Sequence, residues 1–107
     1  MNELYKEMIE KARTGQVEME EDCQHLALIQ DVTPSTTEGC EDCLKIGDKW
    51  VHLRMCLICG KVGCCDNSKN KHASRHNKET GHALICSFEP SEEWIWCYED
   101  EAMIWAS

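Results

Sequence analysis

The sequence predicts a small α+β domain in which an antiparallel sheet packs on one main helix, with an extra helix at the N-terminus. Three observations support this fold class. The chain has 107 residues, the size of one domain with a modest core. Several short apolar segments with strand-like patterns surround a single helical segment. Cysteine and histidine residues recur along the middle of the chain at short spacings, which is typical of a domain stabilised by bound metal.

The N-terminal segment is predicted to form a packing helix over residues 2–13 that ends near Gly15. Its apolar residues recur at helical spacing and would share one face: Leu4, Tyr5, Met8, Ile9 and Ala12. The acidic residues 16–22 are expected to form a connector. We therefore divide the chain into an N-terminal helix with its connector, residues 1–22, and a main domain, residues 23–107.

The first half of the main domain is predicted to contain a loop and a strand. Residues 32–39 are rich in Thr and Ser and include Pro34, as in a loop. Residues 50–55 alternate in polarity, which predicts a half-buried strand that leads directly into Cys56.

The second half is predicted to contain the main helix and the remaining strands. The helix spans residues 71–79 and ends at Gly81. Residues 83–88 are apolar enough for a strand. Residues 94–98 and 102–105 form either two further strands or one strand interrupted by acidic residues.

Eight cysteine and histidine residues supply two complete sets of zinc ligands. They are Cys40, Cys43, Cys56, Cys59, Cys64, His72, His76 and His82. Zinc prefers four Cys sulfur or His nitrogen atoms in a tetrahedron, and a zinc ion with four protein ligands is structural because no position stays open for substrate. Buried thiols or a redox pair are the alternatives, but two Cys-x-x-Cys pairs followed by three His favour zinc. The sequence therefore predicts two zinc ions that stabilise the domain.

Nine cysteines raise the question of a secreted, disulfide-bonded domain. The count is odd, five histidines accompany it, and the N-terminal residues contain no apolar run of the signal-peptide type. No segment approaches the ~20 apolar residues of a membrane span. We therefore expect a cytoplasmic, monomeric protein whose thiols bind metal and which has no membrane partner.

The charge of the chain argues against nucleic acid as a partner. The formal net charge is -9, with 20 acidic and 11 basic residues. Zinc fingers that bind nucleic acid contact phosphate through Lys and Arg, and this chain lacks such a basic surface. Its one local basic stretch, residues 69–78, is more simply the solvated face of a helix.

The cysteine and histidine motifs resemble those of the UBP-type zinc finger, a ubiquitin-binding module attached to many deubiquitinating enzymes and to a cytoplasmic histone deacetylase. The resemblance covers residues 23–101. The motifs that carry it are Cys23-x-His25, Cys40-x-x-Cys43, Cys56-Leu57-Ile58-Cys59-Gly60-Lys61-Val62-Gly63-Cys64, His72-x-x-x-His76, Thr80-Gly81-His82 and Trp96-Cys97-Tyr98.

The resemblance implies which ligands share a zinc ion. Spacing alone would allow His72 and His76 to share one, because they lie on one helix face. In the family they bind different ions, which implies the sets Cys40/Cys43/Cys64/His72 and Cys56/Cys59/His76/His82. Some members hold a third zinc ion, for which this chain offers Cys23, His25, Cys97 and Asp100, with Asp100 in place of the last Cys. The alternative is that Cys23 and Cys97 are only buried and Asp100 is exposed.

The resemblance also implies a peptide-binding pocket. Members that bind ubiquitin place its C-terminal Gly-Gly tail against an Arg and several aromatic residues. Here the corresponding residue is Asp66, which would repel a carboxylate, so binding of the ubiquitin C-terminus is doubtful. Trp96 and Tyr98 match aromatic positions of the family, although they could instead pack in the core. Arg54 replaces another aromatic and could supply the missing cation.

We therefore expect a protein-interaction module that binds a peptide tail of a partner, and not an enzyme. The alternatives are a zinc-dependent hydrolase or deaminase and a redox or metal-handling protein. Against a hydrolase or deaminase, the chain lacks the His-Glu-x-x-His and His-x-Glu motifs of such enzymes. For the second, Cys65 and Cys86 remain outside the ligand sets, but Cys65 lies beside an acid rather than in an electropositive setting.

Overall fold

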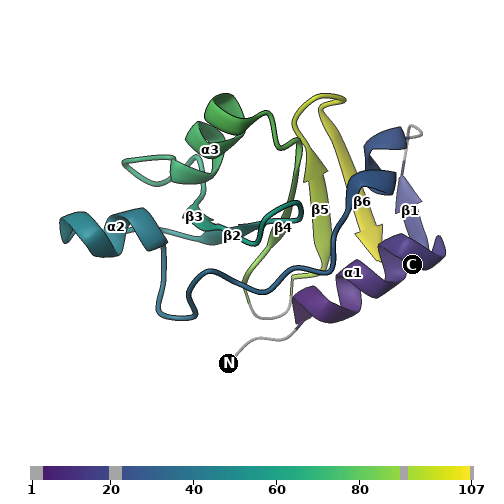
Figure 1. Ribbon diagram of the computed structural model, residues 1–107, viewed down its shortest axis with the longest axis horizontal. Helices are drawn as coiled ribbons and strands as arrows, with labels where there is room; N and C mark the ends of the chain where they lie inside the picture. Colours follow the sequence, from purple (N-terminus) through teal and green to yellow (C-terminus); the bar gives the residue numbers. More distant parts are fainter. Residues whose placement is uncertain (1–3, 20–22, 90–91, 107) are drawn as a thin grey trace.

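A computed structural model describes residues 4–19, 23–89 and 92–106. Six strands form one antiparallel sheet in the order β1-β6-β5-β4-β2-β3 (Figure 1). The strands are β1 (Val17–Met19), β2 (Leu53–Cys56), β3 (Val62–Cys64), β4 (Leu84–Ser87), β5 (Trp94–Cys97) and β6 (Ala102–Ala106). The helices are α1 (Leu4–Thr14), α2 (Glu41–Ile46) and α3 (His72–Thr80), with a 3-10 helix at Gln24–Leu28. The predicted α+β class with an antiparallel sheet is confirmed.

The helix α1 packs on the sheet, as its apolar face predicts. Its residues Tyr5, Met8, Ile9 and Ala12 are all buried, and they join one core with the inward side chains of the sheet. Figure 1 shows α1 beside the β6 and β1 end of the sheet, whereas α2 and α3 lie at the β3 end. None of the helices in the described ranges is long and apolar enough to cross a membrane.

The acidic segment after α1 is more than a connector, because Val17–Met19 forms the edge strand β1. Its residues pair with β6 in antiparallel register, with Glu18 opposite Trp105 and Met19 opposite Ile104. Val17 and Met19 pack against the core while Glu18 is exposed. The alternation of apolar and polar residues over 17–19 is short and lies among acidic residues, so it did not predict a strand. The rest of the predicted connector, residues 20–22, lies outside the described residues.

The strand β2 begins three residues later than the predicted segment 50–55. The amide of Val51 donates a hydrogen bond to Ser68 Oγ at 2.8 Å, and the carbonyl of His52 accepts one from the amide of Cys65 at 2.9 Å. His52 stands opposite Cys65 in the register of β2 and β3, so its hydrogen bond extends that pairing by one residue, whereas the amide of Val51 bonds to a side chain and leaves the ladder. Trp50 instead packs against the cluster of Cys40, Cys43 and Cys64.

The helix α3 lies on the face of the sheet opposite α1. Arg54 and Gly63 are paired across β2 and β3 and so share a face. A Cβ atom at Gly63 would lie 2.9 Å from the backbone nitrogen of Ala73, so glycine is what permits α3 to approach β3 this closely. The helix ends at Thr80, followed by Gly81 in the left-handed conformation with φ 78°, as predicted.

The C-terminal apolar segments form two strands and not one. Trp94 pairs with Trp105 and Trp96 pairs with Met103, so β5 and β6 make a hairpin. The chain reverses through the acidic turn, in which Glu101 has a φ of 48°. Ile95 and Cys97 point to the core on the α1 side and are fully buried. Trp94 and Trp96 therefore project from the face that carries α3.

Candidate metal centres and binding pocket

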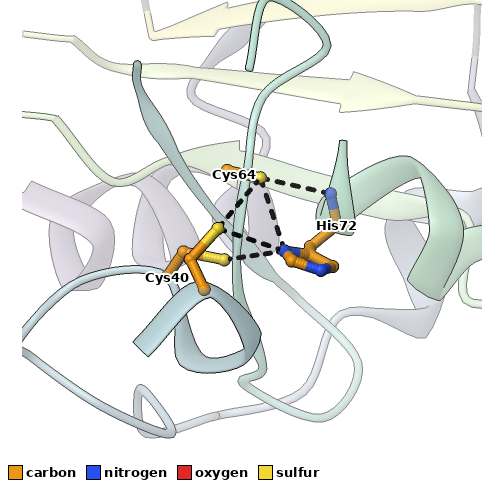
Figure 2. A group of neighbouring side chains, drawn as sticks. Cys40, Cys64 and His72 are labelled. Atoms are coloured by element: carbon orange, nitrogen blue, oxygen red, sulfur yellow. Dashed lines mark hydrogen bonds between the residues drawn. The ribbon is translucent and has the colours of Figure 1, made fainter. Parts of the chain in front are cut away.

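The first candidate metal centre joins α2, β3 and the start of α3. The Nδ1 atom of His72 lies 3.2 Å from the sulfur of Cys40, 3.4 Å from that of Cys43 and 3.6 Å from that of Cys64 (Figure 2). The three sulfur atoms belong to side chains with no exposed surface. Cys40 precedes α2, Cys43 lies within it, and Cys64 ends β3.

These separations fit a tetrahedral zinc ion. Zn–S bonds of about 2.3 Å and Zn–N bonds of about 2.0–2.1 Å place tetrahedral ligand atoms roughly 3.3–3.8 Å apart. The amide of His72 also donates to the sulfur of Cys64 at 3.3 Å, and Asn70 donates to that of Cys43 at 3.6 Å. Burial raises the pKa of Cys40 to about 12, so a thiolate at this position requires a bound cation.

The second candidate centre joins the turn after β2 to the middle of α3 and to the segment that follows this helix. The Nε2 atom of His76 lies 3.3 Å from the sulfur of Cys59 and 3.2 Å from Nδ1 of His82. His82 Nδ1 lies 3.6 Å from the sulfur of Cys56. The set is more open than the first, because Cys59 is exposed and both histidines are half-buried. All four ligand atoms lie within 4.8 Å of one another, as in a metal site.

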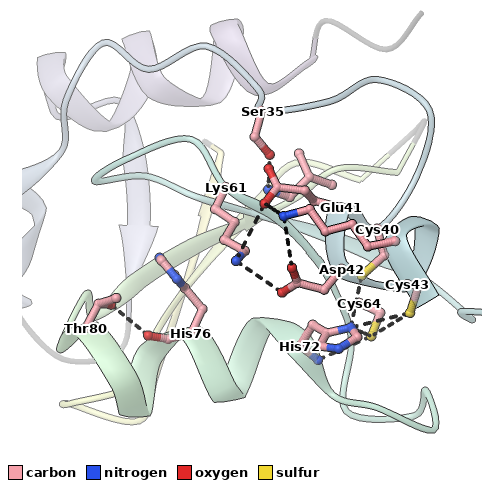
Figure 3. Close-up of polar contacts among 12 residues, drawn as sticks. Ser35, Cys40, Glu41, Asp42, Cys43, Lys61, Cys64, His72, His76 and Thr80 are labelled. Carbon is pink, nitrogen blue, oxygen red and sulfur yellow. Dashed lines mark hydrogen bonds and ion pairs between the residues drawn. The ribbon is translucent and has the colours of Figure 1, made fainter.

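A lysine links the two centres. Lys61 lies between Cys59 and Cys64 in the chain, and its Nζ reaches Asp42 at 3.1 Å and Glu41 at 3.6 Å (Figure 3). Both acids begin α2, the helix that carries ligands of the first centre. The ion pairs therefore fix the turn that supplies both centres against α2. The carbonyl of His76 accepts a hydrogen bond from Thr80 at 2.7 Å.

The third cluster joins the 3-10 helix to the turn between β5 and β6. The Nδ1 atom of His25 lies 3.9 Å from the sulfur of Cys23 and 3.6 Å from that of Cys97. Asp100 Oδ2 lies 3.6 Å from the sulfur of Cys97 and 2.9 Å from His25 Nδ1. Cys23 and Cys97 are buried and Asp100 is exposed, and the four residues nevertheless meet.

This third donor set fits a metal less closely than the other two. The contact between His25 and Asp100 has the length of a hydrogen bond and is shorter than a tetrahedral edge. Hydrogen bonds from Cys23 and then from His25 hold the pKa of Asp100 below its usual range. Burial, followed by the contact with Asp100, raises the pKa of Cys23 to about 12. A bound cation would offset the negative charges of these acidic groups and so favour their deprotonated forms.

The predicted pocket residues Arg54, Asp66, Trp96 and Tyr98 line one hollow of about 230 Å³ between α3 and the sheet. The other side chains around it were not predicted: Cys65, Asn67, Ala73, Ile85, Trp94 and Met103. Trp96 and Tyr98 are half-buried, so they form the wall of the hollow and do not pack wholly in the core. Strand alternation would have identified Trp94, which precedes Trp96 by two residues on the same face.

Arg54 extends across the aromatic wall. Its guanidinium carbon lies 4.6 Å from the centre of the Trp94 ring, which is a cation–π contact. Its Nη1 donates to the carbonyl of Leu53 at 2.9 Å and lies 3.8 Å from the carboxylate of Glu92. A guanidinium group has five N–H donors on three nitrogens. Among the described residues, the polar contacts of Arg54 given above all involve Nη1. Arg54 therefore retains donors for a ligand.

Asp66 occupies another part of the hollow and is held by α3. Ser74 donates a hydrogen bond to its Oδ1, and the Ser74 hydroxyl lies 3.3 Å from that of Tyr98. Burial raises the pKa of Tyr98 above its usual range, and the charge of Asp66 adds to this, whereas the hydrogen bond with Ser74 opposes it. Tyr98 therefore stays a neutral phenol. The hollow presents a cation and an anion within one aromatic surface.

Comparisons with known proteins agree with this geometry. Residues 40–106 match the family model described as the Zn-finger in ubiquitin-hydrolases and other protein. The chain is 32% identical over 96 residues to ubiquitin carboxyl-terminal hydrolase 45 of Mus musculus and 30% identical to that of Homo sapiens. Each alignment covers 72% of this chain, which spans only 11% of the length of these relatives.

A solved structure extends the similarity to a bacterial protein. The solution NMR structure of protein RPA1320 from Rhodopseudomonas palustris is 56% identical, with a TM-score of 0.75. The match covers 83% of this chain and 86% of that one. Both the ligand pattern and the family model therefore lead to one conclusion: the chain belongs to the UBP-type zinc-finger family and is a zinc-binding domain of that type.

Proposed function

We propose that this zinc finger is a non-catalytic interaction module that binds the C-terminal tail of a protein or peptide in the hollow between α3 and the sheet. The observation that carries the proposal is the position of Arg54, whose guanidinium lies on the aromatic wall of that hollow. A charge-assisted hydrogen bond from guanidinium to carboxylate is among the stronger contacts available to a ligand.

Two features support binding rather than catalysis. Each of the two best-formed centres has four Cys or His ligands, which leaves no open zinc position for water or substrate. The hollow is also smaller than the roughly 300–1,000 Å³ of typical pockets for drug-sized ligands, so it suits the last one or two residues of an extended chain.

Ubiquitin is the ligand that the family suggests, but Asp66 disfavours it here. In members that bind ubiquitin, a cation at this position faces the terminal carboxylate of the tail. The carboxylate of Asp66 would repel that group, and Arg54 approaches the hollow from a different strand. We therefore propose that the partner is not free ubiquitin. The terminal carboxylate of this other partner would lie against Arg54.

A chemical-shift titration with pentapeptides of randomised sequence tests the proposal. One mixture carries free C-terminal carboxylates and the other is amidated. We expect saturable shifts at Arg54, Trp96 and Tyr98 with the acid mixture and weaker binding of the amide, because only the acid supplies an anion. Arg54→Gln should remove this difference.

The matched control is Arg75→Gln, which removes an exposed arginine of α3 that does not line the hollow. It should bind both mixtures as the wild type does. Equal binding of acid and amide by the wild-type protein, or shifts confined to another surface, would overturn the proposal.

A further inference from the structure

The hollow contains a carboxylate that recognition of a terminal carboxylate does not use. Asp66 lines the same hollow as Arg54 and is exposed to solvent. Ser74 holds its Oδ1 by a hydrogen bond, which fixes the direction of the side chain. Ser74 is a neutral partner, so this hydrogen bond does not offset the charge of Asp66. Its negative charge is therefore available to a ligand.

Two aromatic rings accompany this carboxylate. Trp96 and Tyr98 line the hollow together with Asp66, and both rings are half-buried. Aromatic faces attract cations, and the attraction is stronger for Trp and for partly desolvated rings. The ring of Trp94 already carries the guanidinium of Arg54, so Trp96 and Tyr98 are the rings that remain for a second cation.

From this arrangement we propose that Asp66, Trp96 and Tyr98 form a subsite for a basic side chain, and that the module prefers tails whose last residue is lysine or arginine. The inference rests on the proposed function, because the terminal carboxylate of the same residue lies against Arg54. The hollow of about 230 Å³ is lined by the cation of Arg54 and the anion of Asp66. A C-terminal lysine or arginine complements both, because it carries a terminal carboxylate and a basic side chain. A tail that ends in glycine has no basic side chain to pair with Asp66, and its terminal carboxylate would repel that residue.

Other charged side chains face the neighbourhood of this subsite. A second hollow is lined by the same Asp66, Trp96 and Tyr98, and around it lie the exposed side chains of Lys71, Lys78 and Glu101. Solvent screens such charges, so they affect the approach of a ligand more than its fit. Glu92 faces Arg54 and its side chain is 40% exposed.

The test measures the binding of five pentapeptides to the whole protein by quenching of tryptophan fluorescence. The peptides have the form Ala-Ala-Ala-Ala-X with X as Lys, Arg, Met or Glu, and a fifth ends in amidated lysine. We expect the Lys and Arg peptides to bind about 5- to 20-fold more tightly than the Met peptide, and the Glu peptide to bind most weakly. Asp66→Asn should abolish the preference for Lys over Met.

The variants separate charge from structure. Asn at position 66 can still accept the hydrogen bond from Ser74, and Asp66→Glu keeps the charge and should retain the preference for Lys. Equal binding of Lys, Met and Glu peptides, combined with weak binding of the amide, would overturn the basic subsite and leave the proposed function standing. A preference for Lys that persists in Asp66→Asn would overturn the role of Asp66. Absence of binding by every peptide would overturn both proposals.

Discussion

Asp66 stands at the position for which the resemblance to ubiquitin-binding members implies an arginine. Its side chain lies in the hollow and is oriented by Ser74. Arg54 is in the same hollow, but its guanidinium is stacked on Trp94 and faces Glu92. The hollow therefore contains a cation on β2 and an anion at the position for which the resemblance implies a cation.

This charge arrangement predicts weak binding of free ubiquitin and a gain of binding in Asp66→Arg. Asp66 is exposed in the free protein. Where a bound tail buries such a charge pair, loss of one partner costs about 2–5 kcal/mol, roughly 30-fold to several thousand-fold in affinity. A chemical-shift titration with intact ubiquitin should show no saturation at micromolar concentration for the wild type, and should show it for Asp66→Arg. Asp66→Asn, which removes the repulsion without adding a cation, should lie between them. Saturable shifts at Trp96 and Tyr98 of the wild type would contradict this prediction.

Asp100 has a corresponding role in the third cluster. It lies 2.9 Å from His25, and Cys23 and Cys97 complete the set. Asp100→Cys should give a tightly held third zinc ion, because four Cys and His ligands are the usual structural set. Elemental analysis after dialysis against a mild chelator checks this, with Glu99→Cys as the control that adds a thiol beside the cluster. The same zinc content in wild type and Asp100→Cys would mean that residue 100 does not limit the site.

At the scale of elements, the contact between α3 and β3 positions both metal centres and the pocket. His72 and His76 come from α3, and so does Ser74, which holds Asp66. The contact depends on Gly63, because a Cβ atom there would meet the backbone of Ala73. A change at this one position therefore acts on centres and pocket together.

Gly63→Ala should displace α3 and weaken the first metal centre most, since the added methyl group would also lie 3.2 Å from the carbonyl carbon of His72. Overpacking of this kind typically costs about 1–3 kcal/mol. Thermal unfolding and zinc-release rates measure the two effects. Glu79→Ala, at an exposed position of α3, is the control and should behave as the wild type. An unchanged zinc-release rate in Gly63→Ala would show that the centre tolerates movement of the helix.

Sequence patterns predicted the elements whose signals are local. The helix α3 ends where Gly81 permits a left-handed residue, and α1 shows its buried face through Met8 and its neighbours. The patterns missed β1, α2 and β3, each of which has six residues or fewer. The conformation of β1 depends on its pairing with β6, and the conformations of α2 and β3 depend on the metal ligands that they position. Both dependences involve residues distant in the sequence.

The same distinction applies to the candidate site. Ligand chemistry and family order predicted the three clusters, because Cys and His at such spacings have few other uses. The direction of Arg54 was open from sequence, since it depends on stacking against Trp94, a residue 40 positions away on another strand. Met103 and Ile85 line the hollow only because β4, β5 and β6 align in one register.

For the whole molecule, bound metal would cross-link α2 and α3 to the sheet, because in the described ranges neither helix contributes a residue to the large apolar core. The first centre ties α2 to β3 and α3, and the second ties the turn after β2 to α3. The core under α1 lies on the other face of the sheet. Metal removal should therefore unfold the part of the chain that contains α2 and α3 first, because zinc-binding free energy is folding free energy where the ligands meet only through the metal.

Elemental analysis should find about two to three zinc ions per chain, since two ligand sets fit a tetrahedron and the third fits less closely. His76→Ala should lose one zinc ion and leave the set of Cys40, Cys43, Cys64 and His72 filled. Loss of both ions in His76→Ala, or a wild-type value near one, would contradict the assignment of ligands. Glu79→Ala serves as a control because Glu79 is an exposed residue of α3 and lies outside the three clusters.

The interleaved order of the ligands also determines the sequence of events during synthesis. The chain leaves the ribosome from its N-terminus at about 5–20 residues per second. Once Cys59 has emerged, two Cys-x-x-Cys pairs are available as one set of four thiols, although in the folded protein each pair belongs to a different centre. A zinc ion that binds those four thiols has to exchange ligands when Cys64 and His72 arrive, and the second native set is complete only with His82. For a zinc ion bound this early, the nascent chain reaches its final arrangement by transfer of metal between partners and not by filling finished sites in turn.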